Sequence, residues 1–487
     1  MNPYPHLLTV QGDRTTNIQP DGSITQLMFD PIRVKFCTVN SSDEEKPVDI
    51  QIPLLGIDQD CSKLRNQVSQ HTHENTRFNN PRNLRIVLGH ACNFRCKYCS
   101  QTHAEKSSVS PTDVFAFVNL CDRTLDYSQL KLIQFWGGEP LLYWPAIKLL
   151  MREFKARIPG VGFSMVTNGS LLTREITDDI LAEEEFGFIL SHDGPGQHLR
   201  GIDPLRRDSR TRPLLLELAT AKCQNDVYRR TSNSGRNFAV NPVITSAVVK
   251  DVASLLDLVD WYDTVFGRAI PIAESIPMIP IQAGTEQYAP CWGNLDLYEE
   301  MLVYTFQQIP IERFDNYRLL YELFATKLMM PEFEVNPTKA LCFTTDPFML
   351  TIDIDGNILP CQTFSKDSIL MDGSKACTNN LHKRFSGQPP KSKIVDSLPT
   401  IHNWAHLDRA GNNCRKCPVV SFCMGGCPYL TGDAHRIDCE VKKHHFHALL
   451  RIFASRILMR KVTSIKFQKD LWFTHEELEN RSDSPSE

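Results

Sequence analysis

The sequence predicts an α/β protein in which a parallel sheet is followed by a cysteine-rich module. From Leu84 onward, short apolar runs alternate with segments of helical periodicity, which is the pattern of consecutive βαβ units. Beyond about residue 335 the chain becomes rich in turns and cysteine. Ten of the 16 cysteines fall into patterned groups, which favours metal ligation over random use in the core.

Six runs are candidate strands, and five segments between them are candidate helices. The strands are expected at 84–89, 130–135, 162–167, 186–191, 238–244 and 269–272. The helices are expected at 111–125, 144–158, 175–185, 213–224 and 249–266. Six such strands imply an open barrel or a doubly wound sheet.

Composition narrows the class of protein. The hydrophobic fraction of 41% is enough for a sizeable core, and the formal net charge of −4 gives no overall attraction to nucleic acid or anionic membranes. The N-terminus lacks the basic flank and apolar run of a signal peptide, and no run of about 18 apolar residues predicts a membrane span. We therefore expect a cytoplasmic protein with neither a membrane nor a nucleic-acid partner.

Four regions are expected along the chain. Residues 1–80 form an N-terminal extension with short β-like runs, and 81–330 hold the barrel. Residues 335–444 are cysteine-rich, with a β-hairpin signal at Asp355-Gly356, and bound metal could supply much of their folding energy. Residues 445–487 read as a helix followed by an acidic tail. The nearby histidines His444, His445 and His447 are interpreted as surface or packing residues.

The first cysteine group follows the first strand directly. Cys92, Cys96 and Cys99 have the spacing C-x3-C-x2-C, and three thiolates this close can hold three corners of an iron–sulfur cube. No fourth ligand lies nearby, which leaves one iron open for a substrate or cofactor. The carboxyl end of a strand is where α/β folds place their chemistry. The alternative is a set of structural thiols or part of a zinc site.

This spacing, with aromatic Tyr98 before the last cysteine, resembles the radical S-adenosylmethionine (SAM) superfamily. Turns that follow the second, third and fourth strands resemble further motifs of the same family. By this resemblance the SAM-binding residues are Gly137, Gly138, Glu139, Pro140, Thr167, Asn168, Ser191 and Asp193. Glu139 suits the ammonium group of SAM because a carboxylate can pair with it.

The resemblance implies a fold and a mechanism. The fold is a partial (β/α)6 TIM-like barrel over about 84–315. The open iron would chelate SAM, and one electron from the reduced cluster would break the sulfonium bond to give a 5′-deoxyadenosyl radical that abstracts hydrogen from the substrate. An external one-electron reductant such as flavodoxin or ferredoxin is therefore an expected partner. The catalytic residues of the chain itself remain unknown at this stage.

A second cysteine pattern lies further along. Its order, C-x13-G-x4-C, then C-x2-C-x5-C-x3-C, then C, resembles the SPASM extension of radical SAM proteins, which mature peptides and proteins. The resemblance assigns one auxiliary [4Fe–4S] cluster to Cys342, Cys361 and Cys427. It assigns a second to Cys414, Cys417, Cys423 and Cys439. With the SAM-binding cluster, three [4Fe–4S] clusters are expected. Structural zinc is the alternative, since four thiolates accept both metals.

Two departures from the SPASM pattern matter. No cysteine lies in the stretch before Cys342 that often completes the first auxiliary cluster, so either an iron stays open or a remote thiol such as Cys291 or Cys377 completes it. Gln362 follows Cys361 where sulfatase maturases carry an aspartate, and an amide is not a base. A sulfatase-maturing activity is therefore not expected.

The leading hypothesis is radical modification of a ribosomally made precursor peptide or a protein, by cross-linking, thioether formation or dehydrogenation. Auxiliary clusters suit net oxidations because they can accept the electron left after hydrogen abstraction. The first alternative is a radical SAM enzyme acting on a small molecule or nucleic acid. The second is a zinc- or cluster-bound scaffold without catalysis.

Overall fold

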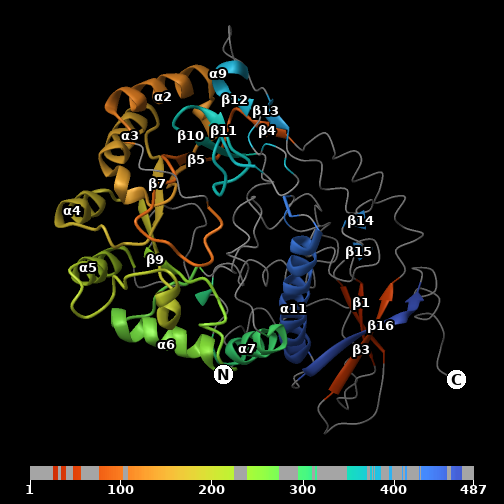
Figure 1. Ribbon diagram of the computed structural model, residues 1–487. Coiled ribbons are helices and arrows are strands. Elements are labelled where there is room, and N and C mark those ends of the chain that lie inside the picture. Colours follow the sequence, from red (N-terminus) through yellow and green to blue (C-terminus); the bar gives the residue numbers. More distant parts are fainter. Residues whose placement is uncertain are drawn as a thin grey trace, which may run out of the picture.

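An eight-stranded sheet forms the centre of the computed structural model, in the order β12-β11-β10-β5-β6-β7-β8-β9 (Figure 1). Its strands are β5 (Asn83–Val87), β6 (Leu132–Trp136), β7 (Gly162–Thr167), β8 (Phe186–Ser191), β9 (Phe238–Asn241), β10 (Met349–Asp353), β11 (Asn357–Ile358) and β12 (Asn379–Asn380). The strands from β10 through β5 to β9 are all parallel. The structure describes residues 26–30, 35–39, 48–55, 76–101, 108–223, 238–273, 294–309, 313–314, 348–369, 379–384, 394–397, 408–409, 412–413, 427, 429–430, 432–457 and 462–473, with a few single residues between them.

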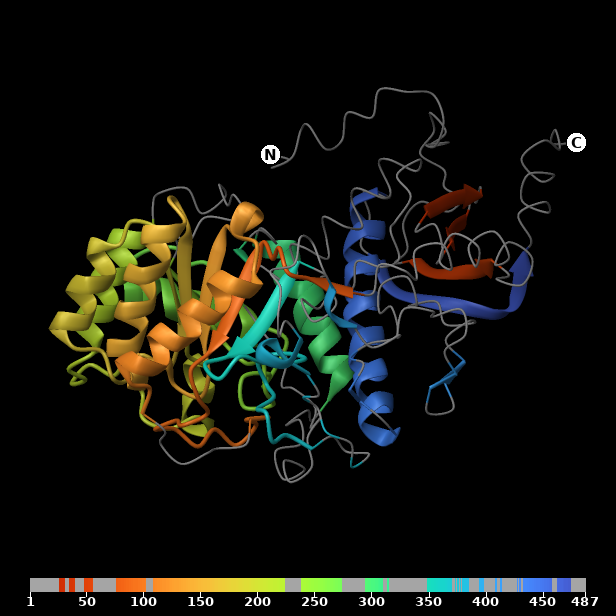
Figure 2. The same cartoon turned by 90° about the horizontal axis from the view of Figure 1, so that it is seen from above.

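Helices cover one face of this sheet (Figure 2). They are α2 (Pro111–Thr124), α3 (Trp144–Arg157), α4 (Arg174–Ala182), α5 (Arg212–Lys222) and α6 (Ser254–Phe266). Burial alternates along β6, where Ile133 and Phe135 are fully buried and their neighbours are not, because successive side chains point to opposite faces of a strand. The Phe135 ring stacks on Phe163 of β7 at 5.9 Å, which joins adjacent strands within the core.

The local pattern places most of these elements correctly. The observed bounds of β7 and β8 equal the expected ones, and α2 and α3 each end one residue before the expected end. Helix α6 begins later than expected, at Ser254 rather than residue 249. The Ser254 hydroxyl accepts the backbone N–H groups of Lys250 and Asp251 at 2.8 and 2.9 Å, which holds the preceding residues in a turn.

The sixth expected strand is reduced to isolated bridges. Ile272 pairs in parallel with Val240 of β9 on one side and with Phe314 on the other. The parallel direction therefore continues past β9, although no regular strand forms there. The α/β class and the partial barrel with a parallel sheet are confirmed.

The sheet does not stop where the barrel region was expected to end. Strand β10 pairs with the whole of β5, Leu350 opposite Leu84, so a strand from the expected 335–444 region completes the barrel sheet. The expected hairpin is present, because β10 and β11 are antiparallel around Asp355 and Gly356. Gly356 has φ +79°, and a Cβ there would lie 2.4 Å from the Leu120 side chain of α2, so this turn requires glycine.

The two ends of the chain share a second sheet, of order β16-β3-β1-β2. Its strands are β1 (Gln26–Asp30), β2 (Lys35–Val39), β3 (Val48–Leu55) and β16 (Val462–Phe473), and β16 runs parallel to β3. The expected regions 1–80 and 445–487 are therefore parts of one structural unit. The acidic tail that was expected beyond residue 476 lies outside the described residues.

Helix α11 (Gly432–Ile457) begins well before the expected residue 445 and crosses the expected boundary between two regions. It packs against α7 (Leu295–Gln308), and in Figure 2 it stands between the barrel and the terminal sheet. Of the three histidines expected to be surface or packing residues, His445 is buried, with its ring 3.1 Å from the Tyr298 hydroxyl of α7. His444 and His447 are partly buried beside Glu299 of α7.

The remaining short elements are peripheral. They are β4 (Thr76–Phe78), which pairs with β13 (Ile394–Ser397), the β14 (Asp408–Arg409) and β15 (Asn412–Asn413) pair, and the short helix α9 (Leu381–Arg384). Among the described helices, none is both long and apolar enough to cross a membrane.

Candidate active site

The loop after β5 carries the first three cysteines at the carboxyl edge of the parallel sheet. Cys92, Cys96 and Cys99 are all partly buried. The Cys99 N–H donates to the Cys96 carbonyl at 3.1 Å, and the Phe94 N–H points to the Cys92 sulfur at 3.4 Å. The loop therefore turns back on itself between Cys96 and Cys99, and it carries all three thiols within eight consecutive residues.

The surroundings hold these thiols in the protonated form. Burial raises the pKa of Cys92 to about 11 and that of Cys96 to about 12, and it also raises the pKa of Cys99. The charge of Arg200 acts in the opposite direction on the pKa of both Cys96 and Cys99. No three His, Cys, Asp or Glu side chains within the described ranges are gathered as a finished metal site. Three soft, neighbouring thiols in one loop nevertheless fit an iron–sulfur cluster, whose binding would release their protons.

The turn after β6 lies directly against the segment that leads into the cysteine loop. The Gly138 N–H donates to the Gly89 carbonyl at 3.0 Å, and the Glu139 N–H donates to the Ala91 carbonyl at 2.9 Å. A Cβ on Gly137 would lie 2.2 Å from the Gly89 oxygen, and one on Gly138 would lie 2.3 Å from the Ala91 oxygen. The two glycines are therefore needed because two backbones meet here.

Glu139 is the central carboxylate of this edge. Its side chain is 1% exposed and accepts the Thr167 hydroxyl at 2.6 Å, the Asn168 N–H at 2.8 Å and the Leu141 N–H at 2.9 Å. Burial raises the pKa of Glu139, and these three hydrogen bonds oppose that rise. Glu139 thereby fixes the end of β7 to the turn after β6, which continues into the 3-10 helix Pro140–Tyr143.

The end of β7 is also tied to the cysteine loop. The Asn168 side-chain amide donates to the side-chain oxygen (Oδ1) of Asn93 at 2.9 Å, and the Asn93 side-chain amide donates to the Ser170 hydroxyl at 2.8 Å. Asn93 stands between the first two cysteines, and this position in the motif was the only signal in the sequence that could have pointed to it. Sequence reasoning missed this link.

The end of β8 is held to the same loop by a buried ionic network. Asp193 is fully buried and accepts the Tyr98 hydroxyl, the Arg200 Nε at 2.9 Å and the Val243 N–H at 2.9 Å. Arg200 also lies over the Tyr98 ring, 5.4 Å from its centroid. Sequence reasoning assigned Asp193 to SAM and missed Arg200. Ser191, the other residue assigned there, lies partly buried at the last position of β8.

Among the auxiliary cysteines, two of the three assigned to the first cluster come together. Cys361 is 8% exposed and belongs to a small cluster with Phe364 and Leu430, and Cys427 packs against that cluster. Cys439 lies on α11, its sulfur 3.8 Å from the His435 Nδ1. Positions 291, 342, 414, 417 and 423 lie outside the described residues.

Two more residues of this region have defined partners. The Cys377 sulfur donates to the Ile358 carbonyl at 3.3 Å. Gln362 joins the segment after β11 to β5 and to the end of the cysteine loop, because its backbone carbonyl accepts the Gln101 side chain at 3.1 Å and its side chain accepts the Arg85 guanidinium.

Comparison with known proteins agrees with this geometry. The sequence profile of the radical SAM superfamily matches residues 86–203, which contain the cysteine loop and the ends of β6, β7 and β8. Residues 86–203 therefore form a radical SAM domain. SAM and a [4Fe–4S] cluster are the cofactors that this class implies, and the three neighbouring thiols fit the cluster.

Individual relatives cover parts of the chain. The radical SAM cyclopropyl synthase TigE of Paramaledivibacter caminithermalis is 26% identical over 196 residues, which cover 36% of this chain and 41% of TigE. The GTP 3′,8-cyclase of Chlorobaculum tepidum is 39% identical over 101 residues, or 20% of this chain and 29% of that enzyme. The chain thus spans less than half the length of these curated relatives.

A solved structure covers more of the chain. Native anSMEcpe with bound AdoMet and Cp18Cys peptide has a TM-score of 0.52 at 17% identity, covering 77% of this chain and 97% of that protein. At this identity the match establishes a shared fold. The radical SAM partial barrel predicted from the sequence is confirmed.

Proposed function

We propose that this chain uses SAM and three [4Fe–4S] clusters to modify a ribosomally synthesised peptide or a protein by cross-linking, thioether formation or dehydrogenation. One observation carries the proposal. The ends of β6, β7 and β8 are each joined by hydrogen bonds to the loop of Cys92, Cys96 and Cys99, or to the residues leading into it. Such convergence at the carboxyl edge of a parallel sheet is the arrangement of a reaction centre.

Different residues are proposed to bind the cluster and SAM. Cys92, Cys96 and Cys99 hold the cluster whose fourth iron receives SAM. The Glu139 carboxylate has about four acceptor positions, and its three protein donors leave one for the ammonium group of SAM. The other proposed SAM contacts are Gly137, Gly138, Pro140, Thr167, Asn168, Ser191 and Asp193. Bound SAM and the reduced cluster supply the radical, while the buried edge of the barrel positions it and excludes water.

Ser191 suits direct contact better than Asp193 does. Asp193 is already paired with the charged Arg200 guanidinium, whereas the three donors to Glu139 are neutral groups, and Ser191 is partly exposed at the end of β8. Asp193 would therefore contribute mainly by holding Tyr98 and the cysteine loop in place.

The auxiliary clusters support a substrate that undergoes net oxidation. Cys342, Cys361 and Cys427 would hold one of them, and the contact of Cys427 with the cluster around Cys361 is consistent with this set. Cys414, Cys417, Cys423 and Cys439 would hold the other. A peptide is bound in the anSMEcpe structure, whose fold this chain shares, and a precursor peptide or protein is accordingly the proposed substrate.

A second candidate function is radical modification of a small molecule. The observation that favours it is the 39% identity with a GTP 3′,8-cyclase over 101 residues. The cysteines after residue 341 favour the peptide instead, because the SPASM pattern that they resemble is associated with maturation of peptides and proteins. Anaerobic incubation with GTP and SAM tests this candidate, since the first function predicts that GTP is not consumed.

The test is iron and acid-labile sulfide per chain after anaerobic purification, together with SAM cleavage under dithionite. Three four-iron clusters require about twelve irons, and a Cys92→Ala/Cys96→Ala/Cys99→Ala variant should keep about eight and lose SAM cleavage. About four irons with additional zinc in the wild type would mean that the later cysteines are structural. A wild type without SAM cleavage would support a scaffold.

A further inference from the structure

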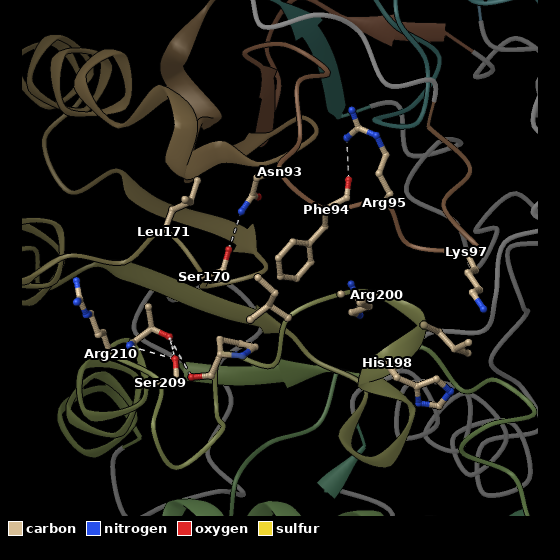
Figure 3. Close-up of a pocket in the computed structure, with 15 residues that line it drawn as sticks. Asn93, Phe94, Arg95, Lys97, Ser170, Leu171, His198, Arg200, Ser209 and Arg210 are labelled. Carbon is tan, nitrogen blue, oxygen red and sulfur yellow. Dashed lines mark hydrogen bonds between the residues drawn. The ribbon is translucent and has the colours of Figure 1, made fainter.

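A cavity of about 640 Å³ lies on the outer side of the cysteine loop, between that loop and the segment after β8 (Figure 3). One wall carries Phe94, Arg95 and Lys97, which alternate in sequence with the cluster cysteines. The other walls come from residues 198–202, Pro204 and residues 209–211, together with Ser170 and Leu171 after β7. Cys92, Cys96 and Cys99 are not among the lining residues, so the cavity borders the loop of the proposed cluster without including its thiols.

The lining is strongly basic. Five of its lining residues have basic side chains, and none is Asp or Glu. The basic residues are Arg95, Lys97, His198, Arg200 and Arg210. This concentration of positive charge contrasts with the formal net charge of −4 for the whole chain. In Figure 3, Lys97 and His198 lie at one end of the cavity and Arg210 lies at the other. A partner that spans the opening would meet positive charge on both sides.

Two of these cations are available for a partner. Within the described part of the chain, the Lys97 and Arg210 side chains form no ion pair, and both are exposed. Of the nearby acids, Asp208 forms an ion pair with Arg206, and Asp203, which is not a lining residue, is hydrogen-bonded to the buried His192. The positive charges of Lys97 and Arg210 are therefore exposed to solvent.

The rim also offers an apolar contact. Ile202 is 72% exposed, the most exposed of the large hydrophobic side chains in the described ranges. The Phe94 ring closes the floor, 3.5 Å from where a Cβ on Gly201 would lie. An exposed aliphatic side chain surrounded by cations is the composition of an interface for an acidic protein.

The walls are fixed to each other. The Lys97 N–H donates to the Leu199 carbonyl at 2.9 Å, and the buried Arg200 joins Asp193 to Tyr98. A partner bound at this surface would therefore be held at a constant position relative to the cysteine loop.

We infer that this surface is the docking site for an acidic one-electron carrier protein that reduces the SAM-binding cluster. The inference rests on the proposed function, which requires one external electron for each cleavage of SAM. At this surface the carrier loses one electron and the cluster gains it across the cysteine loop. Electron transfer needs proximity but no open path.

A substrate does not fit this position. The lining includes none of Gly137, Gly138, Glu139, Ser191 or Asp193, so the cavity does not open onto the proposed SAM site. A peptide bound here would be separated from the radical by the loop itself. The observations therefore favour a reductant over an acidic segment of the substrate.

The experiment uses the anaerobically purified, cluster-loaded full chain and an acidic flavodoxin in its fully reduced state as the probe. Stopped-flow absorbance follows cluster reduction, and SAM cleavage is measured in parallel with flavodoxin or dithionite. Lys97→Glu and Arg210→Glu, which alter opposite walls, should each slow reduction by flavodoxin about tenfold at low salt and weaken its salt dependence. Reduction by dithionite should stay within about twofold of wild type, because a small reductant needs no docking surface.

The matched control is Arg123→Glu/Lys131→Glu, with the same charge change as the combined Lys97→Glu/Arg210→Glu variant. Arg123 is in the last turn of α2 and Lys131 directly precedes β6, so both lie at the opposite edge of the sheet. The control should keep the wild-type rate with flavodoxin. Equal slowing in the control would mean that net charge alone is responsible, and it would overturn the inference.

Three other results would also overturn it. The first is a wild-type rate with flavodoxin in both wall variants. The second is loss of peptide modification, with flavodoxin reduction unchanged, which would assign the cavity to the substrate. The third is a wild type that dithionite reduces but flavodoxin does not. If the proposed function itself is wrong, the result is different, because the wild type would then not cleave SAM even with dithionite. The inference of a docking site would then also be wrong.

Discussion

Replacing Gly138 with alanine tests the close approach on which the whole site depends. The new Cβ would lie 2.3 Å from the Ala91 oxygen, 2.6 Å from the Ala91 carbonyl carbon and 2.7 Å from the His90 oxygen. All three are backbone atoms of the segment leading into Cys92, so no side-chain rotation relieves the contact. The segment must move by roughly 1 Å to restore ordinary van der Waals separation.

That movement has a definite energetic consequence. It would weaken the two backbone hydrogen bonds of this turn, from Gly138 to Gly89 and from Glu139 to Ala91. Each is worth about 1 kcal/mol, and forcing extra volume into a packed position costs about 1–3 kcal/mol more. Gly138→Ala should therefore lower the free energy of unfolding by about 3–5 kcal/mol. It should also reduce iron bound at the first cluster, because Cys92 moves with the segment.

The assay is urea denaturation of the cluster-free chain, with iron per chain measured separately after reconstitution. Gly267→Ala is the control, since Gly267 has φ +65° but nothing within 4 Å of its Cβ position. It should cost only about 1 kcal/mol and leave the iron content unchanged. Wild-type stability and iron content in Gly138→Ala would refute the reasoning, because the backbone contact would then be absent.

Three further predictions concern buried polar groups. Asp193→Ala leaves the Arg200 guanidinium without its carboxylate, so the free energy of unfolding measured in urea should fall by about 3–5 kcal/mol. A decrease below about 1 kcal/mol would contradict the ion pair between Asp193 and Arg200. Tyr98→Phe removes a single hydrogen bond to a charged acceptor and should cost about 1.5–3 kcal/mol, less than Asp193→Ala. Burial lowers the pKa of His445 to about 3 from its ordinary 6.5, so below about pH 6.5 the unfolded state binds a proton that the folded state does not. Relative to His445→Gln, wild type should therefore lose about 2 kcal/mol of stability between about pH 7 and about pH 5, and parallel pH profiles would show that His445 titrates normally.

The site residues proposed from the sequence rest on local signals. The cluster cysteines, Cys92 to Cys99, are contiguous in sequence, and the Gly137-Gly138 turn follows a recognisable strand. Strands β7 and β8 were bounded correctly because apolar runs flanked by turns depend on neighbouring residues alone.

Sequence reasoning failed where distant segments had to be brought together. The division at residues 445 and 335 followed composition, which does not record that β10 pairs with β5 or that β16 pairs with β3. Strand partners are selected by packing and by backbone hydrogen bonds across the sheet. Neither produces a sequence pattern that can be recognised within one strand.

The same limit applies within the site. The sequence by itself predicts which residues would bind a cluster, because the thiol groups and the spacing of Cys92, Cys96 and Cys99 are local features of one loop. Only the tertiary structure shows that Asp193 accepts hydrogen bonds from Tyr98 and Arg200, and that Lys97 and Arg210 line the same cavity. Burial and charge proximity arise when separate strand ends meet at one edge of a sheet, and no single segment contains that information.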